Sequence, residues 1–178
     1  MLRLFAVLLM SMVFAASVSA ADLISMKLCP SKDYDASSRD CANGKSLPAT
    51  GGVIDPAAVG TLQFLTAVKT TNDEEIYHVW ISVGKTSGKV SVYDAATKTL
   101  READASELDW LKARNIEGAR SIIKMTAKPS PRFRLRSEKS FIPSMSGPWK
   151  VQVYAVTATT PLGEITFNVA VPDNGITN

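Results

Sequence analysis

The stretch WKVQVYAVTATTPLGEITFNVAV, residues 149–171, contains two runs of alternating apolar and polar side chains, separated by a turn with Pro161 and Gly163. The apolar positions are Trp149, Val151 and Val153 in the first run and Ile165, Phe167 and Val169 in the second. A period of two places these side chains on one face of a β-strand. The stretch therefore predicts two neighbouring strands, each with one buried and one solvated face, which is typical of antiparallel sheets.

The same strand signals recur upstream, with turn residues between the runs. The segments are TLQFLTAVKT (61–70), EIYHVWISVG (75–84), GKVSVYDA (88–95), SIIKMTA (121–127) and RFRLRSEKSF (132–141). A first short strand is expected in DLISMKLC (22–29). Seven or eight short strands with turns between them favour a mainly β fold, an antiparallel β-sandwich.

One segment, DASELDWLKARNIEGA (104–119), predicts a helix of about ten residues. Asp104 and Glu107 have the spacing of a capping box, which satisfies free backbone N–H groups at a helix start. Gly118 is expected to end the helix. Trp110 lies off the apolar stripe of the helix, and we expect it to contact the edge of the sheet.

The first twenty residues have the features of a signal peptide. Arg3 is followed by an apolar run over residues 4–13, and small residues end the segment at Ala20. We predict cleavage after Ala20 and a periplasmic or secreted protein; an uncleaved membrane anchor is the alternative. Later apolar runs are shorter than the roughly 18 residues of a membrane helix, so no transmembrane segment is expected in the mature chain.

The mature chain divides into three parts by composition. Residues 21–60 are expected to hold the first strand and a disulfide loop, and they are rich in Gly, Pro and Ala towards their end. Residues 61–172 are expected to form the sandwich domain, and residues 173–178 a C-terminal tail. Cys29 and Cys41 enclose a polar loop, and an even pair in an exported chain predicts a disulfide. Two free thiols, redox-active or metal-binding, are the alternative, but no C-x-x-C spacing supports them.

Several of these motifs together resemble the bacterial domain-of-unknown-function family 2914. That family has the pattern H-x-W followed by G-K, then a basic strand containing Ser, then G-x-W-x-V-x-V and L-G-x-x-x-F-x-V. The matching residues are His78, Trp80, Gly84, Lys85, Ser137, Gly147, Trp149, Val151, Gly163, Phe167 and Val169. The resemblance covers roughly residues 61–171 and implies an immunoglobulin-like sandwich in an envelope or exported setting, with these residues in structural roles. It implies no particular activity.

His78 is the one histidine of the chain, and it shares a strand face with Trp80. We expect it to be a packed, hydrogen-bonded core residue. A catalytic or ligand-binding role would require partners, and the sequence has no nucleophile-elbow motif and no set of zinc ligands. The sequence therefore predicts no enzyme activity, no catalytic or metal-binding residues and no cofactor. A hydrolase with an unrecognised site is a weaker alternative.

Arg132, Arg134 and Arg136 lie on one face of a predicted strand, and Lys150 joins them if the next strand pairs alongside. Such a stripe is either a solvated sheet edge or a site for an anionic partner. We expect a binding module for a protein or an anionic envelope component, including an acidic glycan. Nucleic acid is disfavoured, because aromatic residues are not interleaved with the basic ones.

A carbohydrate-binding module is the alternative function. Such modules usually stack sugars on a row of exposed aromatic rings. The sequence offers three aromatic residues that we expect to face outward, Tyr77, Tyr93 and Tyr154, and they are scattered.

Overall fold

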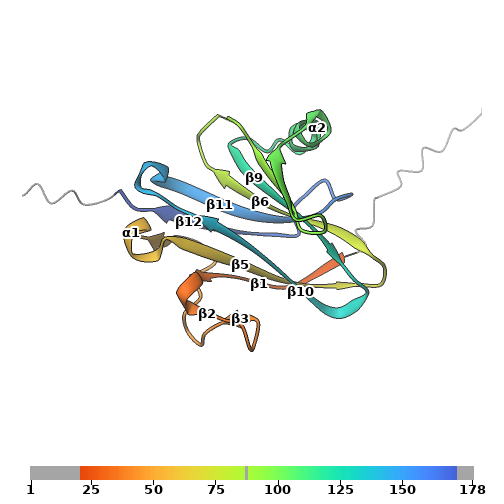
Figure 1. The fold of residues 1–178 in the computed structure, drawn as a ribbon, viewed down its shortest axis with the longest axis horizontal. Helices are drawn as coiled ribbons and strands as arrows, with labels where there is room; N and C mark the ends of the chain where they lie inside the picture. The colour runs from red at the N-terminus through yellow and green to blue at the C-terminus, as the bar shows by residue number, and fades with distance from the viewer. Residues whose placement is uncertain (1–20, 87, 172–178) are drawn as a thin grey trace, which may run out of the picture.

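The computed structural model describes residues 21–86 and 88–171, and its main body is two stacked β-sheets, beside which lies a small two-stranded sheet (Figure 1). The smaller sheet has the order β1 (Ala21–Pro30), β5 (Thr61–Thr70), β10 (Ser130–Ser140). The larger sheet has the order β4 (Gly52–Ile54), β12 (Gly163–Val169), β11 (Gly147–Ala155), β6 (Glu74–Ser82), β9 (Ala119–Ala127), β7 (Ser91–Asp94), β8 (Thr99–Glu102). The predicted mainly β sandwich is confirmed.

The larger sheet is mixed, whereas the sequence predicted antiparallel pairing throughout. β4 runs parallel to β12, and β7 runs parallel to β9. The second parallel pairing follows from the strand order, because β9 lies between β6 and β7 although it comes after both in the sequence. β9 and β7 both run opposite to β6, so β9 is parallel to β7.

The N-terminal segment is more ordered than its composition predicted. β1 pairs with β5 from Ala21 to Pro30, and β4 joins the edge of the larger sheet. A single-turn helix, α1 (Pro56–Val59), begins with Pro56 and is capped by the Asp55 carboxylate. Residues 21–60 therefore contribute β1 to the smaller sheet and β4 to the larger one. The predicted signal peptide, its cleavage site and the tail 173–178 lie outside the described residues. The part of the chain described here has no helix long and apolar enough to cross a membrane.

The core between the sheets is built around Trp80, which is fully buried. Its ring centroid lies 6.2 Å from that of Phe64, 6.1 Å from that of Phe141 and 6.5 Å from that of Phe167, all in edge-to-face geometry. Edge-to-face contacts favour aromatic clusters beyond the burial of their area. The residues that alternate in the sequence thus meet between the two sheets, as their period predicted.

The outer face of the larger sheet is covered by α2 (Ala105–Ala113), which lies at the top of Figure 1. The predicted capping box of Asp104 and Glu107 is present. Trp110 packs on Tyr77 and Tyr154, with ring centroids 5.0 and 5.2 Å apart, so it covers the face of the sheet and not its edge. The predicted solvated faces of β6 and β11 are therefore mostly buried.

The end of α2 differs from the prediction. The chain leaves the helix through Asn115, which has a φ of 52°, and not through Gly118. Asn is the residue other than Gly that adopts this left-handed conformation most readily. Gly118 lies where a Cβ atom would be 2.2 Å from the Ser82 carbonyl oxygen, so it permits a close backbone contact instead.

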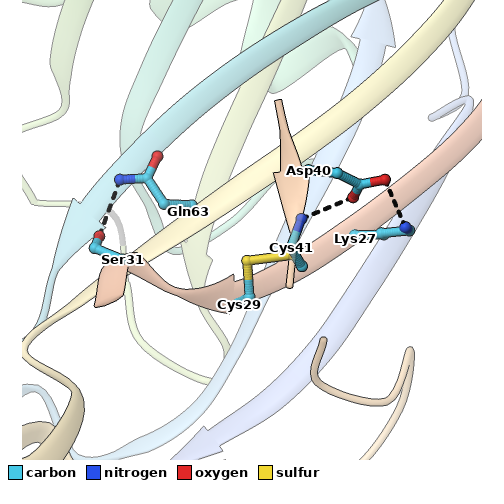
Figure 2. Close-up of a disulfide and its surroundings, with 6 residues drawn as sticks. All are labelled: Lys27, Cys29, Ser31, Asp40, Cys41 and Gln63. Atoms are coloured by element: carbon cyan, nitrogen blue, oxygen red, sulfur yellow. Dashed lines mark hydrogen bonds and ion pairs between the residues drawn. A yellow bond between two sulfur atoms is a disulfide. The ribbon is translucent and has the colours of Figure 1, made fainter. Parts of the chain in front are cut away.

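The predicted disulfide joins Cys29 and Cys41 (Figure 2). It closes a loop that holds a short 3-10 helix (Ser31–Asp33), β2 (Tyr34–Asp35) and β3 (Asp40–Cys41). The cysteines pack with Leu65 and Tyr34 on the outer face of the smaller sheet. Figure 2 also shows Lys27 paired with Asp40 and Gln63 donating to Ser31. The Lys27 Nζ lies 2.8 Å from an Asp40 carboxylate oxygen, and the Gln63 Nε2 lies 2.9 Å from the Ser31 Oγ. These contacts hold the polar loop against β1 and β5.

Candidate functional site

The two sheets differ in width, and the difference leaves a step at one side of the sandwich. Among the described residues, the cluster between the sheets includes side chains of β6, β9, β11 and β12 but none of β7 or β8. The smaller sheet ends at β10, so the inner face of β7 and β8 stays open. We call this face the open shelf. It consists of Ser91, Tyr93 and Leu100, and it is bordered by Ser121 and Ile123 of the neighbouring strand β9.

Strand β10 forms the wall of the open shelf. Residues 136–140 all line the hollow between shelf and wall, whose volume is about 520 Å³. Tyr93 is 38% exposed and Leu100 is 73% exposed, so the shelf presents apolar surface to solvent. A volume of this size is within the usual range of ligand sites.

A second hollow of about 460 Å³ adjoins the first, and Ser91 and Lys139 line both. We call it the basic hollow, after its four cationic residues, which are Lys85, Lys89, Arg120 and Lys139. Serine hydroxyl groups make up most of the remaining polar lining, from Ser82, Ser91, Ser144 and Ser146. Within the described residues, the lining of the basic hollow contains no carboxylate.

Local backbone features place these cations. Lys85 follows Gly84, whose φ of 72° turns the chain at the end of β6. Arg120 lies at a register shift between β6 and β9, since Trp80 pairs with Ser121 and Ile81 pairs with Ala119. A bulge of this kind redirects a side chain out of the regular alternation and is frequent beside functional sites.

Lys139 connects the basic hollow with the open shelf. Its Nζ lies 3.5 Å from the Ser121 Oγ and 5.6 Å from the ring centroid of Trp149. Burial lowers the pKa of the Lys139 ammonium, and the nearby Arg120 guanidinium lowers this pKa further. Lys89, at the outer rim, pairs with Glu102 at 3.3 Å. An anion near Lys139 and Arg120 would reduce the repulsion between these two cations. Their arrangement therefore favours the binding of an anion.

His78 lies behind the wall of the open shelf and is fully buried. Its Nδ1 is 2.8 Å from the Ser137 Oγ, and its Nε2 is 2.9 Å from the Thr66 Oγ1. Burial lowers the pKa of His78 to about 3, so the ring is neutral at physiological pH. Ser137 lines the first hollow but is itself buried. His78 is bonded to Ser137 on one side and to Thr66 on the other, so the group behind the imidazole is a hydroxyl and not the carboxylate of a catalytic triad. The geometry supports a packing role, because solvent does not reach the imidazole.

The arginine stripe is exposed on the outer face of β10, as the alternation predicted. Two of its members hold the disulfide loop: Arg134 donates a hydrogen bond to the Ser38 carbonyl, and the Arg136 guanidinium lies 4.9 Å from the ring centroid of Tyr34. Arg136 also lines the open shelf. Arg132 is exposed at the start of the strand.

Lys150 does not join this stripe, so that part of the prediction is wrong. The chain crosses from one sheet to the other after β10, through a short 3-10 helix (Pro143–Met145), and β11 pairs with β6 and β12. Lys150 therefore belongs to the larger sheet, where its Nζ lies 3.5 Å from a Glu164 carboxylate oxygen.

The other residues singled out in the sequence are mainly structural. Trp149 and Phe167 belong to the core. Gly147 has a φ of 118°, and a Cβ atom at Gly163 would lie 2.5 Å from a methyl group of Leu23. Of the three tyrosines expected to face outward, Tyr77 and Tyr154 are buried, and this part of the prediction is wrong because α2 covers them. Tyr93 is exposed on the open shelf.

Sequence reasoning missed Lys89, Arg120 and Lys139 as site residues and assigned Lys85 only to a family motif. Lys85 and Lys89 lie in the loop between β6 and β7, whereas Arg120 belongs to β9 and Lys139 to β10, so no local pattern unites all four. The nearest signal is GKTSGK (84–89), two Gly-Lys pairs after a strand, which is typical of a basic turn. Within the described chain, no group of three or more His, Cys, Asp or Glu side chains is arranged to hold a metal ion.

No protein-family model and no curated protein sequence matches the chain. Two solved structures align over most of it. One is a selenomethionine-labelled β-glucosidase from Kluyveromyces marxianus, with a TM-score of 0.37 and 12% identity over 82% of this chain but 14% of that one. The other is the C-terminal domain of wzt, with a TM-score of 0.35 and 14% identity over 86% of this chain and 75% of that one. Similarity at this level carries no functional argument.

Proposed function

We propose that this protein is an exported, non-enzymatic binding module that captures an anionic protein or envelope component through the basic hollow. The observation that carries the proposal is the convergence of Lys85, Lys89, Arg120 and Lys139 around one hollow whose described lining has no carboxylate. Arg120 lowers the pKa of the Lys139 ammonium, so these two cations repel each other in the free protein. A ligand with carboxylate or phosphate groups would remove that cost and form charge-assisted hydrogen bonds.

The setting of the protein is part of the same proposal. A disulfide is typical of oxidising compartments, which supports a periplasmic or secreted location. The resemblance to family 2914 stays a prediction, and its matching residues His78, Trp80 and Trp149 lie together in the core. The non-enzymatic character is supported by the burial of His78 and its lowered pKa, since a general base must reach the proton that it abstracts.

An acidic glycan is a second candidate for the anionic ligand. Tyr93 is an exposed ring beside the basic hollow, and serine hydroxyls surround both. A ring of this kind packs against the apolar face of a sugar, while the cations would bind its acidic groups. This candidate keeps the carbohydrate-binding alternative with Tyr93 alone, since Tyr77 and Tyr154 are buried.

The experiment measures binding of three labelled polymers to the mature protein: poly-L-glutamate, polygalacturonate and neutral dextran. We expect at least one acidic polymer to bind, dextran not to bind, and the affinity to fall as salt rises. Each of Lys85→Ala and Arg120→Ala should weaken binding by about tenfold, which corresponds to one charge-assisted hydrogen bond. Lys45→Ala, at an exposed lysine of another loop, is the matched control and should bind like the unaltered protein.

The proposal fails if neither acidic polymer binds, or if both single variants bind as tightly as the control. Stronger binding of polygalacturonate than of poly-L-glutamate, lost in Tyr93→Ala, would select the glycan candidate.

A further inference from the structure

Strand β10 is a free edge of the smaller sheet, beside the open shelf. In the described part of the chain it pairs with β5 on one side and with no strand on the other. Five consecutive residues, 136–140, line the hollow. Consecutive residues of a strand point to opposite faces, so what lines the hollow is the backbone edge and not one face.

The direction of the backbone groups follows from the pairing register. Ser140 lies opposite Thr61, which places Phe141 opposite Gly60, and the Phe141 N–H donates to the Gly60 carbonyl at 2.7 Å. In an antiparallel pair, bonded and non-bonded positions alternate. The N–H and C=O groups of Lys139 and Ser137 therefore point to β5. The N–H and C=O groups of Arg136, Glu138 and Ser140 point away from β5.

This edge has the properties of a strand acceptor. Residues 136–140 contain no proline, so each outward position has an N–H donor. They span roughly 16 Å at the usual rise of a strand. An unpaired edge of this length is a ready template for another extended chain.

The two faces beside the edge define the side chains that an added strand would carry. On the inner face it would lie over Tyr93, Leu100 and Ile123, which favours apolar side chains. On the outer face it would lie beside the exposed Arg134 and Arg136 and beside Glu138, whose carboxylate accepts a hydrogen bond from Gln63. The two arginines favour acidic side chains opposite them. At the Ser140 end, Lys139 connects the shelf with the basic hollow, where a further acidic group would be bound.

We propose that β10 accepts an extended segment of a partner protein as an added fourth strand of the smaller sheet, with acidic side chains outward and apolar side chains inward. This inference rests on the proposed function and names the class of its partner. Backbone hydrogen bonds supply affinity in such complexes, and alternate side chains supply specificity.

The experiment uses the acetylated, amidated peptide Glu-Val-Glu-Val-Glu-Val-Glu as the probe and amide hydrogen exchange of the mature protein as the main readout. In the free protein we expect slow exchange at Ser137 and Lys139, which bond to β5, and fast exchange at Arg136, Glu138 and Ser140. The peptide should slow exchange at these three alternate positions by tenfold or more. Slower exchange at alternate residues distinguishes an added strand from side-chain binding. Side-chain binding would not slow the exchange of every second backbone amide.

Two further peptides and one pair of variants sharpen the result. A peptide with Lys in place of Glu should not bind. Two N-methylated forms, each blocking one alternate set of peptide N–H groups, should differ, with one losing tenfold or more in affinity and the other close to the parent. Leu100→Ser should weaken binding several-fold, whereas Val53→Ser, at a 65% exposed valine on the opposite edge of the larger sheet, should not.

The inference is overturned if the peptide binds without alternate protection, or if both N-methylated forms bind like the parent. It is also overturned if polygalacturonate binds to the basic hollow while the peptide does not. In that case the proposed function stands and the partner is a glycan. If neither the peptide nor the acidic polymers bind, both proposals fail.

Discussion

His78 should make the stability of this protein sensitive to acid, and the effect can be isolated with His78→Gln. The ring is fully buried and bonded to the hydroxyls of Thr66 and Ser137. Burial lowers its pKa from 6.5 to about 3. Between these values, the unfolded chain takes up a proton that the folded protein does not. Stability from the neutral ring is therefore complete above about pH 6.5 and is lost as the pH falls toward 3.

The magnitude follows from the linkage relation. Each pH unit between the two pKa values costs about 1.4 kcal/mol, so lowering the pH from 7.5 to 4.5 should remove about 3 kcal/mol of unfolding free energy through His78 alone. Glutamine has no such titration, but it replaces the two hydroxyl contacts imperfectly. We expect His78→Gln to cost about 1–2 kcal/mol at pH 7.5. At pH 4.5 the order should be reversed, with the variant more stable by about 1 kcal/mol.

The assay is urea unfolding of both proteins at several pH values from 7.5 to 4.5. Carboxylates such as Asp35, whose pKa is lowered to about 2 by hydrogen bonds from Ser37 and Ser38, titrate in both proteins and cancel in the difference. A difference in unfolding free energy that stays constant over this range would refute the reasoning, because it would mean that His78 is accessible or already charged. Binding of the acidic probes should be the same in both proteins at pH 7.5, and loss of binding in the variant would place His78 in the site.

Three further predictions concern the core, the loop and the helix. Trp149→Ala should lower the free energy of unfolding by about 3–5 kcal/mol, since a buried indole is lost and a cavity remains; an unchanged urea midpoint would contradict its burial. The native protein should take up no alkylating reagent at Cys29 and Cys41 by intact mass, and reduction should cost about 3 kcal/mol for a loop of this size; two reactive thiols without reductant would exclude the disulfide. Glu107→Ala should cost about 1–3 kcal/mol, because Arg101 loses a two-pronged ion pair at 2.6 and 2.7 Å and the helix start loses its cap. Urea melts measure this cost, with Glu102→Ala as the exposed control, and an equal loss in both would be evidence against the buried pair.

Local sequence patterns were sufficient to predict the main strands, the start of the helix and the disulfide of this protein. A period of two predicted the main strands and their buried faces, since it depends only on the geometry of an extended chain. The capping box predicted the start of α2, because its bonds join residues three apart. The disulfide was predicted from the count of two cysteines in a chain with a signal-like leader. Each of these signals lies within one segment or in the composition.

The sequence did not determine which strands became neighbours, and the candidate site depends on that. Alternation in β10 and β11 is the same whether they pair or belong to different sheets, so the placement of Lys150 beside the arginines was an open choice and proved wrong. The burial of Tyr77 and Tyr154 depended on where α2 packs.

The basic hollow and the open shelf arise only in the tertiary structure. Lys85, Arg120 and Lys139 are far apart in the chain and meet because the ends of several strands converge. The shelf exists because the larger sheet extends past β10 to β7 and β8. The width of a sheet is a property of long-range pairing, whose hydrogen bonds join backbone groups that every residue other than proline has in common. Side-chain patterns therefore predicted the strands, and only the packed fold decided which edge stayed open.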